Sequence, residues 1–317
     1  MQEKLDLFQS ILTVDNGYGD IKWVWKNRKG DIKKGKFTSI VAEAPMSAND
    51  MPLIDGHRYF MGQEAFMRDS KDIIEIVDYS KLRTFSPLFL WKVMEELGIT
   101  PDDIDHLVIG LSLAQIDQSD DFKKRMSSFK INNVTYSFKD KISLIPQGVG
   151  AKYAIERNFE NKSTYLLIDI GFSTIDVVDV IDGKVRPENV KGYPHEGIIK
   201  IARLLQEYLL DEFDEIVSLK EVKEVMKTKK FRANGVDHDL SEVIKQFSAK
   251  YTERTMKSLK IRYKREFQKY TKIYFVGGGA YFIDESASPI ICAVKDPEYY
   301  NALGNYYYKE GQLTSKN

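Results

Sequence analysis

Two aspartates in this sequence stand where a carboxylate could hold magnesium beside a bound phosphate. Asp15 and Asp169 each end a run of β-forming apolar residues, and each precedes a glycine turn, at Gly17 and Gly171. Glycine turns present backbone N–H groups, and a missing Cβ lets a phosphate approach closely. A carboxylate at the strand end can hold Mg²⁺ through water, since Mg²⁺ keeps much of its hydration shell. The pattern therefore predicts two phosphate-binding turns that face each other.

Other side chains could complete such a site. Lys22 could reach a phosphate as a point charge, and Ser173 and Thr174 supply hydroxyl donors. The three glycines 277–279 offer a flat backbone surface for a base or a ribose. Each feature alone is common, since a lone Asp-x-Gly turn is usually only a turn. The segment after Gly19 has the pattern of a strand rather than a helix, which argues against a dinucleotide-binding fingerprint.

The elements that carry these residues occur twice in the chain. Residues 11–25 and 165–180 both have the pattern of a strand, a tight turn and a second strand, and a further hairpin turn follows each. Such a repeat indicates an internal duplication at domain scale. We expect a first domain at 1–150 and a second at 151–296. A helix at about 297–317 is expected to pack back on the first.

The segments between and after the repeats follow ordinary helix and strand patterns. The sequence predicts strands at 107–111, 142–145 and 272–276, and helices at 151–157, 196–210, 241–270 and 297–308. A polar tail is expected to follow the last helix.

The composition limits the classes of function. The chain has 317 residues, and 47 basic and 47 acidic residues give zero formal net charge. No net field attracts it to nucleic acid, so we expect no direct sequence-specific DNA binding. A solvated helix face is the favoured interpretation of the basic stretch 257–265, ahead of a nucleic-acid contact. One cysteine, no signal peptide and no long apolar segment favour a cytoplasmic protein without a membrane anchor.

The ordered set of motifs resembles the superfamily of actins, sugar kinases and heat-shock chaperone ATPases, and above all its ParM-like plasmid-segregation actins and archaeal actin-like proteins. The resemblance rests on five segments in order, namely a first phosphate loop at 14–22, a connecting segment at 145–151, a second phosphate loop at 167–176, an adenosine motif at 275–280 and a closing helix at 301–304. None is specific singly, but the group spans almost the whole chain. The resemblance implies an α/β chain with the actin-like fold, two duplicated ribonuclease-H-like domains around a nucleotide cleft.

The resemblance also implies roles for particular residues. Asp15 and Asp169 would organise Mg²⁺ through water, and Gln147 would orient the attacking water, so that Gln147 and Asp169 are the catalytic residues. An amide is no strong base, so hydrolysis would be slow. The residues implied at the nucleotide, ATP or GTP, are Asp15, Asn16, Gly17, Tyr18, Gly19, Lys22, Gly171, Phe172, Ser173, Thr174, Gly277, Gly278 and Gly279. Two residues depart from the family pattern. Tyr18 stands where a small hydroxyl residue is common, and Phe172 stands where a glycine is frequent.

The function that the resemblance implies is an ATPase that forms nucleotide-dependent filaments of this chain alone, for plasmid DNA segregation with a DNA-binding adaptor of the ParR type. The alternative is a small-molecule, sugar-type kinase of the same fold, although the sequence has no obvious loop for its general base. A chaperone would need a substrate-binding domain after the core. A membrane-linked actin would need an anchor, and the tail 309–317 has only one large apolar residue.

Overall fold

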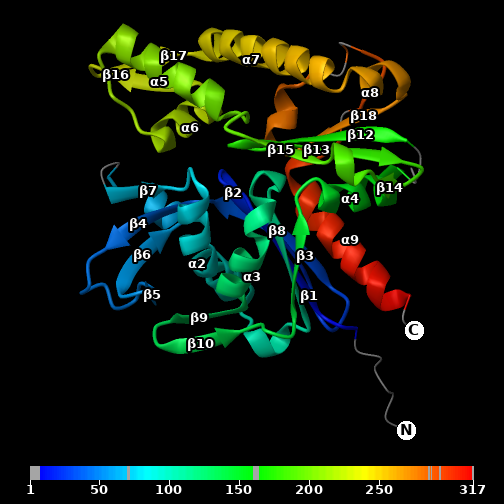
Figure 1. Cartoon of the computed structure of the whole chain (residues 1–317). Coiled ribbons are helices and arrows are strands. Elements are labelled where there is room, and N and C mark those ends of the chain that lie inside the picture. The colour runs from blue at the N-terminus through cyan, green and yellow to red at the C-terminus, as the bar shows by residue number, and fades with distance from the viewer. Residues whose placement is uncertain are drawn as a thin grey trace.

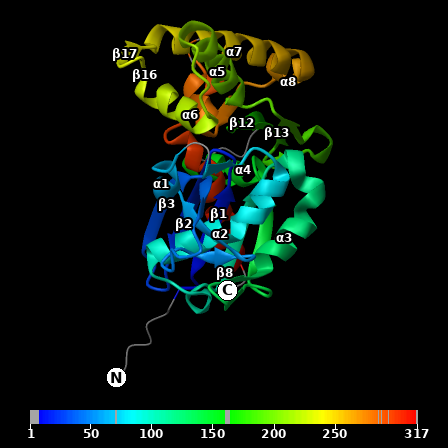
Figure 2. The same ribbon diagram turned by 90° about the vertical axis from the view of Figure 1, so that its left-hand side faces the viewer.

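The computed structural model describes residues 8–69, 72–159, 164–284, 286, 288–292 and 294–315. Two mixed sheets lie one above the other in Figure 1, and each carries its own hydrophobic core. The two halves remain distinct when the molecule is turned, with the helices of the second half above and the first sheet below (Figure 2). This is the α/β architecture expected from the sequence.

The first sheet is built around the hairpin that carries Asp15. Its order is β11-β8-β1-β2-β3, with β2 antiparallel to β1 and β8 parallel to it. All six residues of β1 are buried, because β2 and β8 flank the strand and helices cover its faces. The bounds are β1 Ile11–Asn16, β2 Asp20–Lys26, β3 Ile32–Thr38, β8 His106–Leu111 and β11 Ile142–Pro146.

The second sheet repeats this arrangement around Asp169. Its order is β14-β13-β12-β18-β19, and β15 also pairs with β13. Again the second strand is antiparallel to the first, and a later strand, β18, is parallel to it. The duplicated strand–turn–strand pattern is therefore present in both sheets. The bounds are β12 Tyr165–Ile170, β13 Thr174–Ile181, β14 Lys184–Val185, β15 Lys191–Pro194, β18 Ile273–Val276 and β19 Ile291–Cys292.

Smaller elements complete the first half. In the four-stranded sheet β5-β6-β4-β7, strands β4 and β6 contact α1. Helix α2 packs on the first sheet with Leu82, Leu88 and Phe89 fully buried. The bounds are β4 Ile40–Ala44, β5 Leu53–Ile54, β6 His57–Met61, α1 Gln63–Phe66, β7 Ile73–Glu75, α2 Tyr79–Leu97, η2 Pro101–Asp103, η3 Leu113–Gln118, α3 Ser119–Ser127, β9 Ser128–Ile131 and β10 Val134–Ser137.

Helices form the far side of the second half, at the top of Figure 1. The predicted helix 241–270 is wrong in its continuity, because it breaks into two helices at Tyr263. The Tyr263 side chain is buried, and its hydroxyl lies 2.9 Å from that of Tyr193. The bounds are η4 Pro187–Asn189, α5 Ile199–Phe213, α6 Leu219–Thr228, β16 Lys230–Ala233, β17 Val236–Asp239, α7 Ser241–Arg262, α8 Lys264–Lys269, η5 Gly278–Phe282 and η7 Pro297–Tyr299.

Two helices, α4 (Val149–Phe159) and α9 (Tyr300–Thr314), cross where the two sheets meet. Both pack on the second sheet, and α9 also packs on β1, where the Thr13 hydroxyl donates to the carbonyl of Ala302 at 2.8 Å. Of the two ends expected for the last helix, 308 is wrong, since α9 continues to Thr314, close to the end of the range 297–317. Its last turns are held by Glu310, which pairs with Lys26 of β2 at 2.8 Å and accepts from Tyr306 at 2.5 Å.

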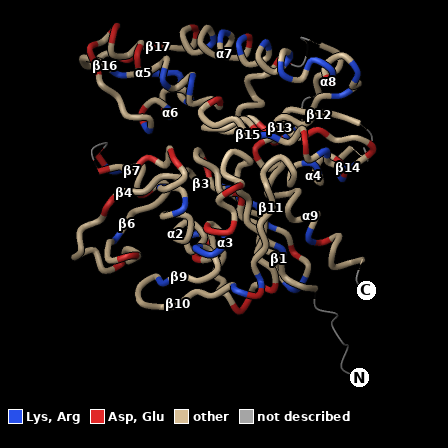
Figure 3. The backbone as a smooth tube through the Cα atoms, in the orientation of Figure 1, with Lys and Arg blue, Asp and Glu red and all other residues tan. Residues whose placement is uncertain are grey.

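The charged residues are spread over both halves (Figure 3). The basic stretch 257–265 lies on α7 and α8, where its lysines and arginines are exposed while Leu259 and Tyr263 are buried in the core. This is the alternation of a solvated helix face. None of the helices in the described part of the chain has both the length and the apolar character needed to cross a bilayer.

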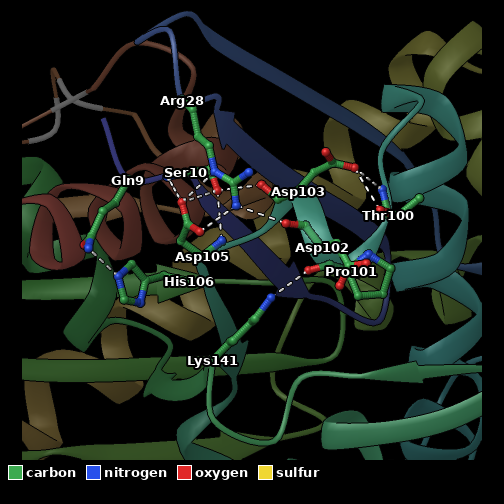
Figure 4. A network of polar contacts seen from close by, with 10 residues as sticks. All are labelled: Gln9, Ser10, Arg28, Thr100, Pro101, Asp102, Asp103, Asp105, His106 and Lys141. Atoms are coloured by element: carbon green, nitrogen blue, oxygen red, sulfur yellow. Dashed lines mark hydrogen bonds and ion pairs between the residues drawn. The ribbon is translucent and has the colours of Figure 1, made fainter. Parts of the chain in front are cut away.

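A polar network fixes the end of the first sheet at which β1 and β8 begin (Figure 4). Asp105 accepts hydrogen bonds from the Arg28 guanidinium at 2.7 and 3.1 Å, and from the Ser10 backbone N–H at 2.8 Å. The Arg28 hydrogen bond is the largest cause that lowers the pKa of Asp105 from 3.8 to about 2. The network therefore ties β1, the β2–β3 turn and the start of β8 together through one carboxylate.

We expect Asp105→Asn to lower the free energy of unfolding at pH 7 by about 1 kcal/mol, since solvent screening reduces the value implied by the pKa shift. A depressed pKa stabilises the fold above pH 3.8, and this contribution is lost as the pH falls toward 2. Urea unfolding of both proteins at a series of pH values should therefore show a difference that shrinks below pH 4. A difference independent of pH would show that the charge of Asp105 is not its cause.

Candidate functional site

A cavity of about 470 Å³ lies between the two halves, and the turns of both duplicated hairpins form its walls. The turn after β18 and the helix α6 close its other sides. Of the residues predicted at the nucleotide or in catalysis, the cavity wall includes Asp15, Gly17, Tyr18, Gly19, Lys22, Gln147, Asp169, Gly171, Phe172, Ser173, Thr174, Gly277 and Gly278.

Two predicted residues lie behind the cavity wall. The Asn16 amide points into the first sheet, where it donates to the carbonyls of Val14 and Gly110 at 3.3 and 3.4 Å. Gly279 packs against the side chain of Ile170, leaving no room for a Cβ. Both residues therefore support the turns rather than line the space between them.

The two aspartates at the centre are each held by one amide side chain. Gln147 Nε2 donates to Asp15 Oδ1 at 2.6 Å, and Asn301 Nδ2 donates to Asp169 Oδ2 at 2.5 Å. Lys22 Nζ lies 4.0 Å from the other oxygen of Asp15. Both carboxylates are buried, so their orientation is set by these contacts and not by solvent.

Burial also sets the electrostatics of this pair. It is the largest cause that raises the pKa of Asp15, against the opposing effects of Lys22 and of the Gln147 hydrogen bond. Burial, with a further contribution from the charge of Asp15, raises the pKa of Asp169 to about 6. Two buried carboxylates whose charges repel each other favour the uptake of a cation between them.

The donor set fits magnesium. Mg²⁺ is usually held by one or two carboxylates and completes its octahedral shell with water and phosphate oxygens. Asp15 and Asp169 supply such a pair on the cavity wall. Within the described ranges, histidine, cysteine and carboxylate side chains form no group of three that could enclose a metal by itself.

The glycine turns touch each other across the cavity. A Cβ on Gly19 would lie 2.9 Å from the Cβ of Phe172, which makes this the contact between the first and second turns. Gly277 has a φ of +81°, and a Cβ there would fall on Asp169 Oδ1. Only glycine allows the third turn to approach the carboxylate so closely.

Tyr18 and Phe172, the two departures from the family pattern, take different positions. Tyr18 is buried in the core of the first half, and burial is the main cause that raises the pKa of its hydroxyl. Phe172 is half-buried between the halves, and Lys223 Nζ lies 4.1 Å from the centre of its ring. The hydroxyl of Ser39 donates to the carbonyl of Gly17 at 2.6 Å and so steadies the first turn from behind.

Sequence reasoning missed several residues of this region. Asn301 was seen only as part of the closing helix, although it also accepts from the Gly148 N–H at 2.8 Å. Asp176 on β13 is fully buried behind the second turn, and the Ser112 hydroxyl donates to it at 3.0 Å. Burial is the main cause that raises the pKa of Asp176 well above 3.8. A carboxylate inside a run of valine and isoleucine was the available signal for it.

The lysines of α6 were missed as well. Lys220, Lys223 and Lys227 recur at helical spacing and all line the cavity. Lys220 also connects the two halves at the cavity wall, where its Nζ donates to the Arg68 carbonyl at 2.9 Å and lies 5.0 Å from the centre of the Phe66 ring. Their spacing on one face of an amphipathic helix was a detectable signal.

Two family models match the chain, one in each half. Residues 13–150 match the family described as the N-terminal domain of actin-like proteins. Residues 167–288 match the family described as the C-terminal domain of the MreB-like archaeal actin homologue. A search of curated proteins finds no match.

Solved structures share the fold at low sequence identity. A ParM from Clostridium botulinum, solved as a 15-stranded filament, is 20% identical, with a TM-score of 0.78 over 96% of this chain and 99% of that chain. An archaeal actin homologue in complex with ADP is 18% identical, with a TM-score of 0.72 over 96% of this chain and 100% of that one. A ParM from Bacillus thuringiensis with ATP is 18% identical, with a TM-score of 0.60 over 98% and 100%.

The duplicated sheets, the cavity between them and the family models in both halves lead to one conclusion. The chain belongs to the actin-like superfamily, with ParM and the archaeal actin homologues among its structural neighbours.

Proposed function

We propose that this chain binds and hydrolyses ATP, or GTP, in the cavity between its halves and that the bound nucleotide controls its assembly into filaments. The observation that carries the proposal is the pair Asp15 and Asp169, each fixed by an amide, between two glycine turns. The two halves would be actin-like domains at 1–150 and 151–296. Nucleotide bound between them would bias their relative orientation.

The roles of the residues follow from their places on the wall. The backbone N–H groups of the two turns would bind the phosphates, and Lys22 would add a positive charge beside them. Asp15 and Asp169 would hold Mg²⁺ through water, and the ion would neutralise charge that develops on the phosphates. The base and ribose would lie against Gly277 and Gly278.

Gln147 would orient the attacking water in this proposal. It stands on the cavity wall beside Asp15, and its side chain is almost fully buried. Its amide can donate and accept a hydrogen bond but cannot remove a proton efficiently at neutral pH. Slow hydrolysis suits a protein whose assembled state must last longer than one catalytic event.

The filament role draws on the structural neighbours. One ParM is described as a filament, and others are described with ADP or ATP. Head-to-tail contact between identical copies gives an open filament when the rotation between them does not close. The role we propose is plasmid DNA segregation, with a DNA-binding adaptor of the ParR type, because the balanced charge of this chain gives it no general attraction to DNA.

Sedimentation of the purified protein with Mg-ATP, with Mg-ADP and without nucleotide tests the proposal. We expect pelleting with ATP or a non-hydrolysable analogue and filaments in electron micrographs of the same samples. Monodisperse protein under all conditions, across a range of salt concentrations, would contradict the filament role. Turnover that depends on an added sugar and occurs without pelleting would instead support the kinase alternative.

A further inference from the structure

Asn305 is a buried amide whose side chain has no hydrogen-bond partner among the residues that the structure describes. It lies on α9, is 1% exposed, and neither its Nδ2 nor its Oδ1 bonds to any residue in the part of the chain that the structure describes. Buried amides are nearly always paired, because an unmade hydrogen bond to a buried polar group is costly. An exception beside a functional site indicates a partner that another state of the protein supplies.

The surroundings of Asn305 identify that partner. Gly110 of β8 pairs with Asp15 across the first sheet, and a Cβ on Gly110 would lie 2.9 Å from Asp15 Oδ1 and 3.5 Å from Asn305 Nδ2. The carboxylate and the free amide therefore border the same small space, which exists because residue 110 has no side chain. The other amide atom, Asn305 Oδ1, faces Gly150, just after the segment that carries Gln147.

The spacing on α9 repeats a contact already made one turn earlier. Asn301 donates to Asp169, the carboxylate of the second hairpin. Asn305 follows four residues later, on the same face of the helix, and borders Asp15, the carboxylate of the first hairpin. The helix thus presents one amide to each of the two aspartates, but only the first is hydrogen-bonded.

The missing contact matters because of what Gln147 does in this structure. Its Nε2 donates to Asp15 Oδ1 at 2.6 Å, so this contact fixes how the amide is turned and leaves its Oε1 and its second N–H for other partners. If the whole amide turned toward a water in the cavity, a buried carboxylate oxygen would lose its donor. A second donor beside Asp15 removes that penalty.

We propose that Asn305 is a positioning residue that takes over Asp15 Oδ1 and so releases Gln147 to hold the attacking water. The inference rests on the proposed hydrolytic function. In the arrangement described above Gln147 bonds to Asp15, and the Asn305 amide has no partner among the described residues. In the arrangement that we propose for hydrolysis, Asn305 Nδ2 would donate to Asp15, and the Gln147 amide would face the cavity.

The variant Asn305→Leu tests this, since leucine has nearly the shape of asparagine and no donor. We expect turnover to fall about tenfold with nucleotide affinity unchanged, because only the release of Gln147 is impaired. In the Gln147→Ala background the same substitution should have no further effect on turnover. Without nucleotide, the melting temperature should rise by about 2 °C, because an unpaired amide is replaced by an apolar group.

Asn158→Leu is the matched control. Asn158 lies on α4, and its Nδ2 already donates to the Tyr300 hydroxyl at 3.2 Å. Its replacement should leave turnover unchanged and should not raise the melting temperature. Should leucine prevent folding at 305, Asn305→Ala is small enough to fit, and the comparison between the two Gln147 backgrounds is made with it.

The outcomes separate the two proposals. An equal fall in turnover in both Gln147 backgrounds, or no fall in either, would overturn the role of Asn305 alone. A lower melting temperature of Asn305→Leu without nucleotide would also overturn it, because the amide would then have a partner in the empty protein, such as an ordered water. Absence of any turnover by the unchanged chain would overturn the hydrolytic function and this role together.

Discussion

The substitution Asp169→Asn is expected to lower nucleotide turnover at least about 100-fold and, without nucleotide, to make the protein more stable. Turnover falls because the neutral amide cannot help to hold Mg²⁺ beside the phosphates. Stability rises because burial penalises the ionised carboxylate, as the pKa of about 6 records. The shift from 3.8 corresponds to a gain of about 3 kcal/mol in the free energy of unfolding at neutral pH.

The stability gained by Asp169→Asn should depend on pH. An acid whose pKa is raised on folding binds its proton more tightly in the folded state. The cost of ionising Asp169 therefore develops between pH 3.8 and about 6 and is complete above that range. The advantage of Asp169→Asn in urea unfolding should accordingly disappear as the pH falls through the same range.

Asp179→Asn provides the control for Asp169→Asn. Asp179 is a buried carboxylate on β13, but it is not on the cavity wall, and it accepts from the Tyr270 hydroxyl at 2.8 Å and the Asn189 amide at 2.7 Å. Its replacement should leave turnover unchanged. Normal turnover by Asp169→Asn would remove this residue from the proposed site.

For Gln147→Ala we expect nucleotide affinity close to that of the unchanged chain and turnover lowered about 10- to 100-fold, because the attacking water loses the group that orients it. Filaments formed with ATP should persist longer, since the ATP-bound state lasts longer. Phosphate release and light scattering, followed in the same sample, measure the two effects together.

A second effect of Gln147→Ala reports on the hydrogen bond from Gln147 to Asp15, separately from the proposed contact between Gln147 and the attacking water. The Gln147 hydrogen bond lowers the pKa of Asp15, so its loss should raise that pKa further. The acidic limb of the pH profile of turnover should then move to higher pH. Gln206→Ala, which removes an amide that donates to the Val217 carbonyl at 2.8 Å in the second half, should change neither turnover nor the profile. Weak ATP binding with normal turnover of what binds would contradict the role given to Gln147.

The sequence predicted the parts of the fold that depend on local pattern. The hairpins around Asp15 and Asp169 were predictable because runs of apolar β-forming residues, a carboxylate and a glycine turn all lie within short segments. The break at Tyr263 was not, because it depends on a tyrosine from β15. The extra length of α9 was hidden in the same way, since Lys26 and Glu310 meet only in the folded chain.

The candidate site shows the same limit. The turn residues and both aspartates were found as ordered motifs. The amide that donates a hydrogen bond to each aspartate was not found in this way. Gln147 and Asn301 each donate to a partner that is far away in the sequence. Asp176 was not predicted as part of the site. Its place beside Ser112 and behind the second turn is visible only in the folded chain.

The contact of Lys220 at the cavity wall would bear on the rates of nucleotide exchange under the proposed function. Lys220 joins α6 to the carbonyl of Arg68 and the ring of Phe66. If this contact is made in both the empty and the loaded protein, it must break each time a nucleotide enters or leaves. It then slows uptake and release of nucleotide by the same factor. It leaves the dissociation constant unchanged and lengthens the residence time. If the chain forms filaments as proposed, a subunit with such a contact would keep its nucleotide through one round of assembly.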